Sequence, residues 1–137
     1  MSQKIKVYIA GPVSNSPETQ RPFFHLMATR LEKAGFLVLY TGRLPIGLSE
    51  PDYMKVAHSM LEICDVVLML DGWDKSDGAN AEYHWAKKLE RQVILPEEVN
   101  EFILDGPQEA RTSLMKHRVR IMAPHFIEPE ENVVRVI

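Results

Sequence analysis

Residues 66–70 read Val-Val-Leu-Met-Leu, an apolar run in which no polar residue alternates with the others. A strand with one face in water alternates apolar and polar residues, whereas a strand covered on both faces is apolar throughout. Strands of the second kind are typical of parallel sheets that have helices on both sides. The run therefore predicts a buried strand of a parallel sheet.

Other short β-branched or aromatic runs are separated from this strand by segments with helical periodicity. Such alternation predicts βαβ units, which build a parallel sheet. We expect a flavodoxin-like, doubly wound α/β fold with a mainly parallel sheet of about five strands flanked by helices. The other strands are expected at 5–10, 36–40 and 92–96, with a fifth at 120–122 or 133–137, and the helices at about 21–34, 51–64, 79–90 and 107–120.

Composition limits the classes of protein that the chain can belong to. Its 137 residues, 45% hydrophobic and 26% charged, predict a single ordered domain over 1–137. The net charge of -3 argues against binding nucleic acid or an anionic membrane through bulk charge. Cys64 is the only cysteine, so we expect no intrachain disulfide and interpret it as a small core residue. Without a visible signal peptide or a run long enough to span a bilayer, a cytoplasmic protein is expected.

Two polar, glycine-containing segments follow the first and third expected strands, at 11–16 and 71–78. Ligands of open α/β sheets bind at the carboxyl ends of the strands. Ser76 and Gly78 stand at the start of a helix, where N–H groups and the helix dipole suit a phosphate. Glu82 follows Gly78 by about 6 Å of helix rise, and the dipole would favour its ionised form at pH 7. An ionised carboxylate there could attack a sugar anomeric carbon, although on spacing alone a glutamate that only complements the dipole is the commoner case.

Several other kinds of site are not favoured by the sequence. The five histidines show no zinc-ligand spacing, and no P-loop or dinucleotide-binding glycine pattern is present, so we expect no metal and no cofactor. A flavin-binding domain would need a Ser/Thr-rich loop after the first strand, which the chain lacks. Trp73, in the loop after the third strand, could instead stack on a nucleobase.

Three segments at the ends of the expected strands form a pattern. Residues 8–12 read Tyr-Ile-Ala-Gly-Pro, residues 64–70 lead from Cys-Asp into Gly72-Trp73, and 76–82 read Ser-x-Gly-Ala-x-x-Glu. Over residues 5–96 this pattern resembles the nucleoside 2-deoxyribosyltransferase superfamily, which includes deoxynucleoside 5'-monophosphate N-glycosidases. The resemblance implies a small-molecule nucleoside or nucleotide as substrate and a homodimer or larger homo-oligomer.

The resemblance also implies roles for particular residues. Glu82 matches the catalytic glutamate, which attacks C1' of the sugar and holds it as a covalent ester. Tyr8 matches a tyrosine that lies under the sugar and orients this glutamate. Ser76 and Gly78 match positions that bind the 5'-phosphate in the nucleotide-hydrolysing branch.

The loop after the first strand matches the superfamily less closely. Gly11, next to Pro12, corresponds to a backbone contact near the substrate. The nucleotide-hydrolysing branch uses an arginine where this chain has Ser14, so Arg21 or Arg43 would have to replace it.

One departure concerns the acid that assists the leaving base. The superfamily usually carries an aspartate at the position of Ala57. His58 is adjacent, but it points about 100° away around a helix. Asp71 or Asp74 would have to reach the base from the loop.

The predicted function is therefore cleavage or transfer of the N-glycosidic bond of a nucleoside or its 5'-monophosphate through Glu82. The alternative is a nucleotide-binding or sensing module of the same fold that does not cleave its ligand, for which Ala57 would need no replacement.

Overall fold

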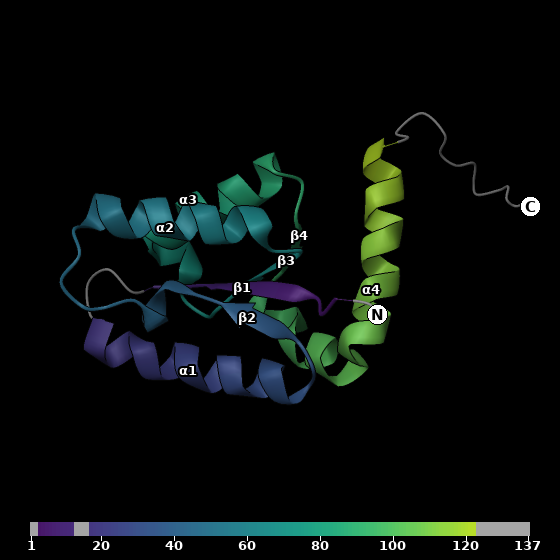
Figure 1. The fold of residues 1–137 in the computed structure, drawn as a ribbon, viewed down its shortest axis with the longest axis horizontal. Helices are drawn as coiled ribbons and strands as arrows, with labels where there is room; N and C mark the ends of the chain where they lie inside the picture. The colour runs from purple at the N-terminus through teal and green to yellow at the C-terminus, as the bar shows by residue number, and fades with distance from the viewer. Residues whose placement is uncertain (1–2, 13–16, 123–137) are drawn as a thin grey trace, which may run out of the picture.

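The computed structural model describes residues 3–12 and 17–122, and its strands form one parallel sheet in the order β2-β1-β3-β4 (Figure 1). Every pairing is parallel, and β3 is buried along its whole length. The prediction of a doubly wound parallel sheet from the apolar run is thus confirmed. The strands are β1 Lys6–Ala10, β2 Leu37–Leu39, β3 Val66–Met69 and β4 Gln92–Ile94.

Helices follow each strand and cover both faces of the sheet (Figure 1). Strand residues alternate between these faces: Val7 and Ile9 join a core with α1 and α4, whereas Tyr8 and Ala10 join a second core with α2 and α3. None of the helices in the described ranges is both long and apolar enough to cross a membrane. The helices are α1 Pro17–Lys33, α2 Glu50–Ile63, α3 Asp77–Lys88 and α4 Val99–Met122, with short 3-10 turns η1 Thr41–Arg43, η2 Trp73–Lys75 and η3 Pro96–Glu98.

The expectation of a fifth strand is wrong at 120–122, because these residues form the end of α4. The other candidate, 133–137, lies outside the described residues. The sheet built by the described residues therefore has four strands.

Helices α1, α3 and α4 begin at least two residues earlier than their sequence patterns predicted, α4 at Val99 rather than at 107. Helix α1 begins at Pro17 rather than near Arg21. Helix α3 begins at Asp77 rather than Ala79, because the Ser76 hydroxyl accepts a hydrogen bond from the Ala79 N–H at 3.2 Å and caps the helix. This shift of α3 moves Glu82 out of the first turn and into the second.

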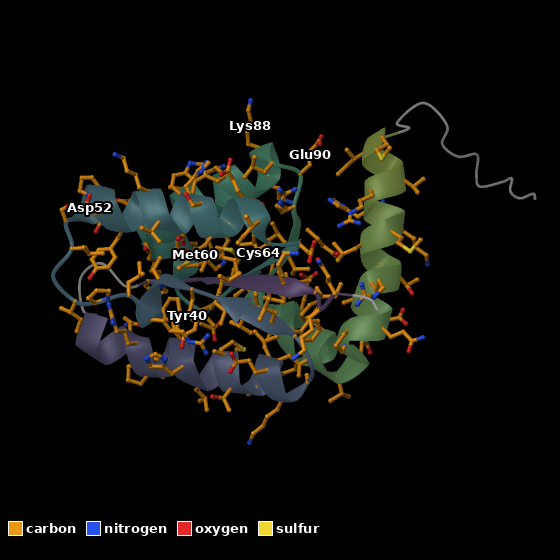
Figure 2. The ribbon with its side chains drawn as sticks, viewed as in Figure 1. Tyr40, Asp52, Met60, Cys64, Lys88 and Glu90 are labelled. Atoms are coloured by element: carbon orange, nitrogen blue, oxygen red, sulfur yellow. The ribbon has the colours of Figure 1, made fainter. Side chains whose placement is uncertain are left out.

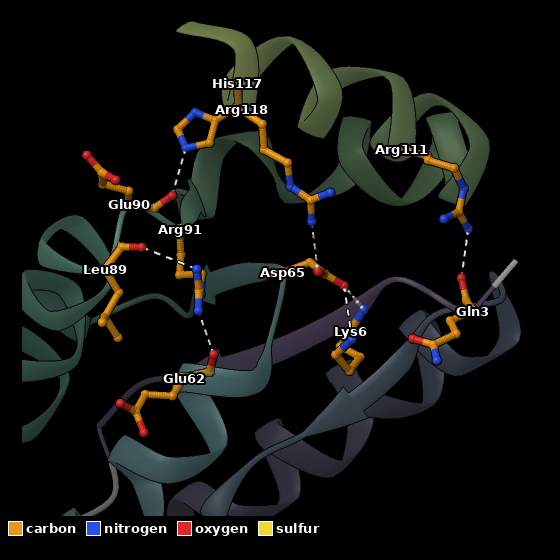
Figure 3. Close-up of polar contacts among 10 residues, drawn as sticks. All are labelled: Gln3, Lys6, Glu62, Asp65, Leu89, Glu90, Arg91, Arg111, His117 and Arg118. Atoms are coloured by element: carbon orange, nitrogen blue, oxygen red, sulfur yellow. Dashed lines mark hydrogen bonds and ion pairs between the residues drawn. The ribbon is translucent and has the colours of Figure 1, made fainter. Parts of the chain in front are cut away.

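Helix α4 consists of two parts joined at Gly106, whose φ of 84° interrupts the helix. The second part crosses the amino-terminal ends of the strands (Figure 3). There Arg118 pairs with Asp65 at 3.4 Å, and Arg111 donates to the Gln3 carbonyl at 3.0 Å. Since Gln3 precedes β1 and Asp65 precedes β3, this helix covers the end of the sheet opposite to the one where the candidate site lies.

Cys64 is buried among apolar side chains, as predicted. It lies with Met60 between α2 and the sheet (Figure 2), and its relative exposure is 2%. Burial raises the pKa of its thiol to about 12. A thiol that stays protonated at neutral pH is a packing residue rather than a nucleophile.

Candidate active site

A cavity lies at the carboxyl ends of β1 and β3, where the order of the strands reverses. The chain runs from β1 to β2 on one side and then returns to β3 on the other, and open α/β sheets bind ligands at such a switch point. The cavity encloses about 640 Å³, counting the part open to solvent. It is lined by Tyr8, Ile9 and Gly11 from β1 and its end, Arg21 and Phe24 from α1, Thr41 from η1, Glu50, Tyr53, Met54 and Ala57 from α2, and Ser76, Gly78, Ala79 and Glu82 from α3 and its cap.

Glu82 and Tyr8 meet at the inner wall of this cavity. The Tyr8 hydroxyl donates a hydrogen bond to Glu82 Oε2 at 2.5 Å. Both side chains are buried, with relative exposures of 1% for Tyr8 and 7% for Glu82. The contact joins residues 74 apart in the sequence, since Tyr8 points from β1 toward the face covered by α3. Because this bond occupies Oε2, the other carboxylate oxygen is the one available for chemistry.

Glu82 differs from the ionised carboxylate that the sequence predicted. Burial raises its pKa from the ordinary value of 4.5 to about 8; the bond from Tyr8 lowers it, and the nearby charge of Glu50 raises it. Two causes explain the wrong prediction. The helix dipole acts mainly within the first turn of a helix, and Glu82 lies in the second turn. In addition, desolvation strongly disfavours a buried charge. Glu82 is therefore mostly protonated at pH 7.

Tyr8 remains a hydrogen-bond donor over the whole physiological pH range. Burial raises its pKa well above 10, and the charge of Glu82 raises it further. A hydrogen bond with the Thr41 side chain acts in the opposite direction. The phenol can thus hold the glutamate in one orientation without itself losing a proton.

The lining of the cavity also includes the start of α3, with its Ser76 cap, and Arg21. The first N–H groups of a helix have no intrahelical acceptor and can bind an anion. Arg21 donates to the carbonyls of Gly42 at 3.0 Å and Leu44 at 2.8 Å, which fixes its side chain beside the cavity. Its Nε is buried and has no hydrogen-bond partner among the described residues. Together these groups could hold an anionic part of a ligand.

Three of the predicted site residues lie away from this cavity, and a fourth cannot be placed. Pro12 and Asp71 line a second hollow, beside the exposed side of α1. Trp73 stacks on Tyr83, with ring centroids 4.8 Å apart and planes at 24°, and it does not line the cavity. Ser14 lies outside the described residues.

Some of the residues considered as replacements for the missing acid and the missing arginine line the cavity, and others do not. Ala57 lines the cavity, but His58 packs edge-on against Trp85, with ring centroids 4.6 Å apart. Asp74 is exposed in η2 and is absent from the cavity wall. Of the two arginines, only Arg21 lines the cavity, because Arg43 pairs with Glu32 at 3.0 Å on the surface.

Most of the lining residues that the sequence analysis missed come from the second βα connection, and the others are Ile9, Phe24 and Ala79. Thr41 lies at the end of β2, and Glu50, Tyr53 and Met54 lie in the first turns of α2. A signal for the helical residues was present, because positions 50, 53, 54 and 57 share one helix face. Within the described ranges, no group of three or more His, Cys, Asp or Glu side chains could hold a metal ion.

The fold is that of nucleoside 2-deoxyribosyltransferase-like proteins, as the sequence motifs suggested. The structure is similar to a 2-desoxiribosyltransferase from Leishmania mexicana, with a TM-score of 0.54 and 16% identity over 66% of this chain and 63% of that one. It is also similar to a CMP N-glycosidase from Clostridium botulinum, with a TM-score of 0.50 and 22% identity over 66% of this chain and 69% of that one. At these identities the similarity shows a common fold.

The chain belongs to the family described as a domain of unknown function, DUF4406, whose family model matches residues 5–95. This range contains every residue that lines the cavity. No match was found among curated protein sequences.

Proposed function

We propose that this protein cleaves or transfers the N-glycosidic bond of a nucleoside or a nucleoside 5'-monophosphate. The observation that carries the proposal is the pair of Glu82 and Tyr8, a carboxyl group held by a buried phenol at the wall of a cavity. The names of the two similar structures, a deoxyribosyltransferase and an N-glycosidase, support the same class of reaction.

Glu82 acts as the nucleophile in this proposal. Its free oxygen attacks C1' of the sugar, and the electron pair of the C1'–N bond leaves with the base. The sugar is then held as an ester of Glu82, which water or a second base resolves at the same carbon. Tyr8 holds Oε2 throughout, so the attacking oxygen is presented to C1' in one orientation. Because attack needs the carboxylate, activity should rise with pH up to about 8, the pKa of Glu82.

The 5' end of the substrate is assigned to the start of α3 and to Arg21. The first turn of α3, Gly78 included, and Arg21 line the same cavity. Positive groups on two elements favour a 5'-phosphate over a 5'-hydroxyl. The base is assigned to the apolar lining supplied by Phe24, Tyr53 and Met54, because Trp73 is engaged with Tyr83.

The test is to incubate the protein separately with deoxynucleosides, with their 5'-monophosphates and with the ribonucleotides, and to measure free base by chromatography. We expect release of base, fastest from a 5'-monophosphate, and its loss in Glu82→Gln. Binding of these compounds without release of base, equally tight in wild type and Glu82→Ala, would reject the proposal. That result would instead indicate the nucleotide-binding module, which Ala57 and the protonated Glu82 favour.

A further inference from the structure

The cavity contains a second carboxyl group, that of Glu50, in addition to the buried Glu82. Glu50 is the first residue of α2, and its side chain lines the same cavity. It is also close enough to Glu82 for its charge to raise the pKa of that residue. The aspartate that resembling proteins carry is replaced in this chain by Ala57, on the wall formed by the same helix.

Helix geometry relates these two positions. Glu50 and Ala57 are seven residues apart, so they differ by about 20° around the helix and by about 10 Å along it. Met54 lies between them on this face. A glutamate at the start of the helix therefore faces the same cavity from a point nearer to its mouth. The Ser49 cap, which accepts from the Asp52 N–H at 3.2 Å, fixes where the helix begins and hence where Glu50 stands.

We propose that Glu50 is the acid and base catalyst of the reaction, in place of the residue missing at position 57. This inference rests on the proposed function. In the first step the Glu50 carboxyl gives its proton to the departing base nitrogen while Glu82 bonds to C1'. In the second step the Glu50 carboxylate takes a proton from the attacking water, the C1'–Oε bond breaks, and Glu82 leaves as a carboxylate. The sum is nucleoside plus water giving base plus sugar. The reacting form has Glu82 ionised and the proton on Glu50, the reverse of the arrangement in which the charge of Glu50 raises the pKa of Glu82, and both carboxyl groups return to the reacting form.

The other acidic residues near the mouth do not fit this role. Asp52, Asp74 and Asp77 are exposed, and none of them lines the cavity. Asp71 faces the second hollow. Glu50 is therefore the one carboxyl group besides Glu82 on the cavity wall among the described residues.

A second readout follows from the charges around Glu82. The titratable and charged groups that line the cavity with it are Tyr8 from β1, Arg21 from α1, and Glu50 and Tyr53 from α2. Of these, Glu50 is the one whose charge raises the pKa of Glu82. Removing that charge should lower this pKa, so the rise of activity with pH should begin at lower pH in Glu50→Gln. This shift tests whether the charge of Glu50 reaches Glu82, whatever the role of Glu50, whereas the loss of kcat described next tests its role as the acid.

The experiment compares Glu50→Gln with the control Glu62→Gln, which removes an exposed carboxyl from the end of the same helix. The substrates are the deoxynucleoside monophosphate cleaved fastest by wild type and N7-methyl-2'-deoxyguanosine 5'-monophosphate. The base of the second is already cationic and leaves without a proton. We expect Glu50→Gln to lose about 10²–10⁴-fold in kcat on the first and less than about 10-fold on the second, with circular dichroism unchanged. The control should behave as wild type.

The outcomes separate this inference from the function on which it rests. If wild type releases no base from either compound, the proposed function fails and this inference fails with it. If wild type is active but Glu50→Gln keeps its kcat and pH profile, only the role of Glu50 is refuted. An equal loss on both substrates would also refute it, because an acid is needed for only one of them.

Discussion

Replacing Glu82 with glutamine should stabilise the protein, and the gain should grow as the pH rises from 5 to 8. The pKa of this carboxyl is about 8 in the folded protein and near 4.5 when exposed. Between these values the folded state keeps a proton that the unfolded state releases, so each pH unit lowers the free energy of unfolding of wild type by up to about 1.4 kcal/mol. This contribution is fully present below pH 4.5 and is lost as the pH rises toward 8.

The size of the effect follows from these two values. Between pH 5 and pH 8 wild type should lose about 3 kcal/mol relative to Glu82→Gln, which has no proton to release. At pH 5 the two proteins should differ by no more than about 1 kcal/mol, because the glutamine oxygen can still accept the hydrogen bond from Tyr8.

The assay is urea unfolding at pH 5, 6, 7 and 8, followed by the fluorescence of Trp73 and Trp85. Glu109→Gln is the matched control, since it makes the same change in charge at an exposed position of α4. Its stability should remain parallel to that of wild type at every pH. If Glu82→Gln is also parallel to wild type, the carboxyl of Glu82 is not desolvated in the folded protein, and the argument from burial is refuted.

Three further substitutions test the contacts around the cavity. Tyr8→Phe removes the bond that lowers the pKa of Glu82, so the rise of activity with pH should move to higher pH, opposite to Glu50→Gln, and an unmoved profile would contradict the assigned contact. Gly11→Ala places a Cβ 3.0 Å from the Cβ of Leu70 and should cost about 1–3 kcal/mol in urea unfolding; an unchanged midpoint would show that the neighbours can move aside. Arg21→Gln should raise KM for a 5'-monophosphate by about 10-fold or more and change KM for the matching nucleoside much less, whereas equal changes would argue against a phosphate contact.

The fold was predictable because it depends on short-range patterns, whereas the central pair of the site was implied by the resemblance of the motifs that contain it. The apolar run at 66–70 shows burial on both faces without any knowledge of its neighbours. Alternation along β1 places Tyr8 on one face of the sheet, and the start of α3 brings Glu82 to the same face. The resemblance of the motifs that contain these two residues implied that they meet, although the residues are 74 positions apart.

The ionisation of Glu82 and the place of Trp73 could not be obtained from the same patterns. The pKa depends on how completely other elements cover the carboxyl, and those elements come from distant parts of the chain. The ring of Trp73 has a partner, Tyr83, that approaches only after η2 and α3 have formed. Glu50 was missed for a different reason. Its helix face could be read from the spacing, but nothing in the spacing tells which cavity that face lines.

The position of Glu50 on α2 affects the free-energy cost of placing two carboxyl groups in one cavity. Two carboxyl groups buried side by side would each raise the pKa of the other, and desolvation would add to both. Ala57 is 1% exposed, so an aspartate there would be such a buried neighbour, whereas Glu50 is exposed at the cavity mouth. At its exposed position the Glu50 carboxyl is still close enough to Glu82 for its charge to raise the pKa of Glu82.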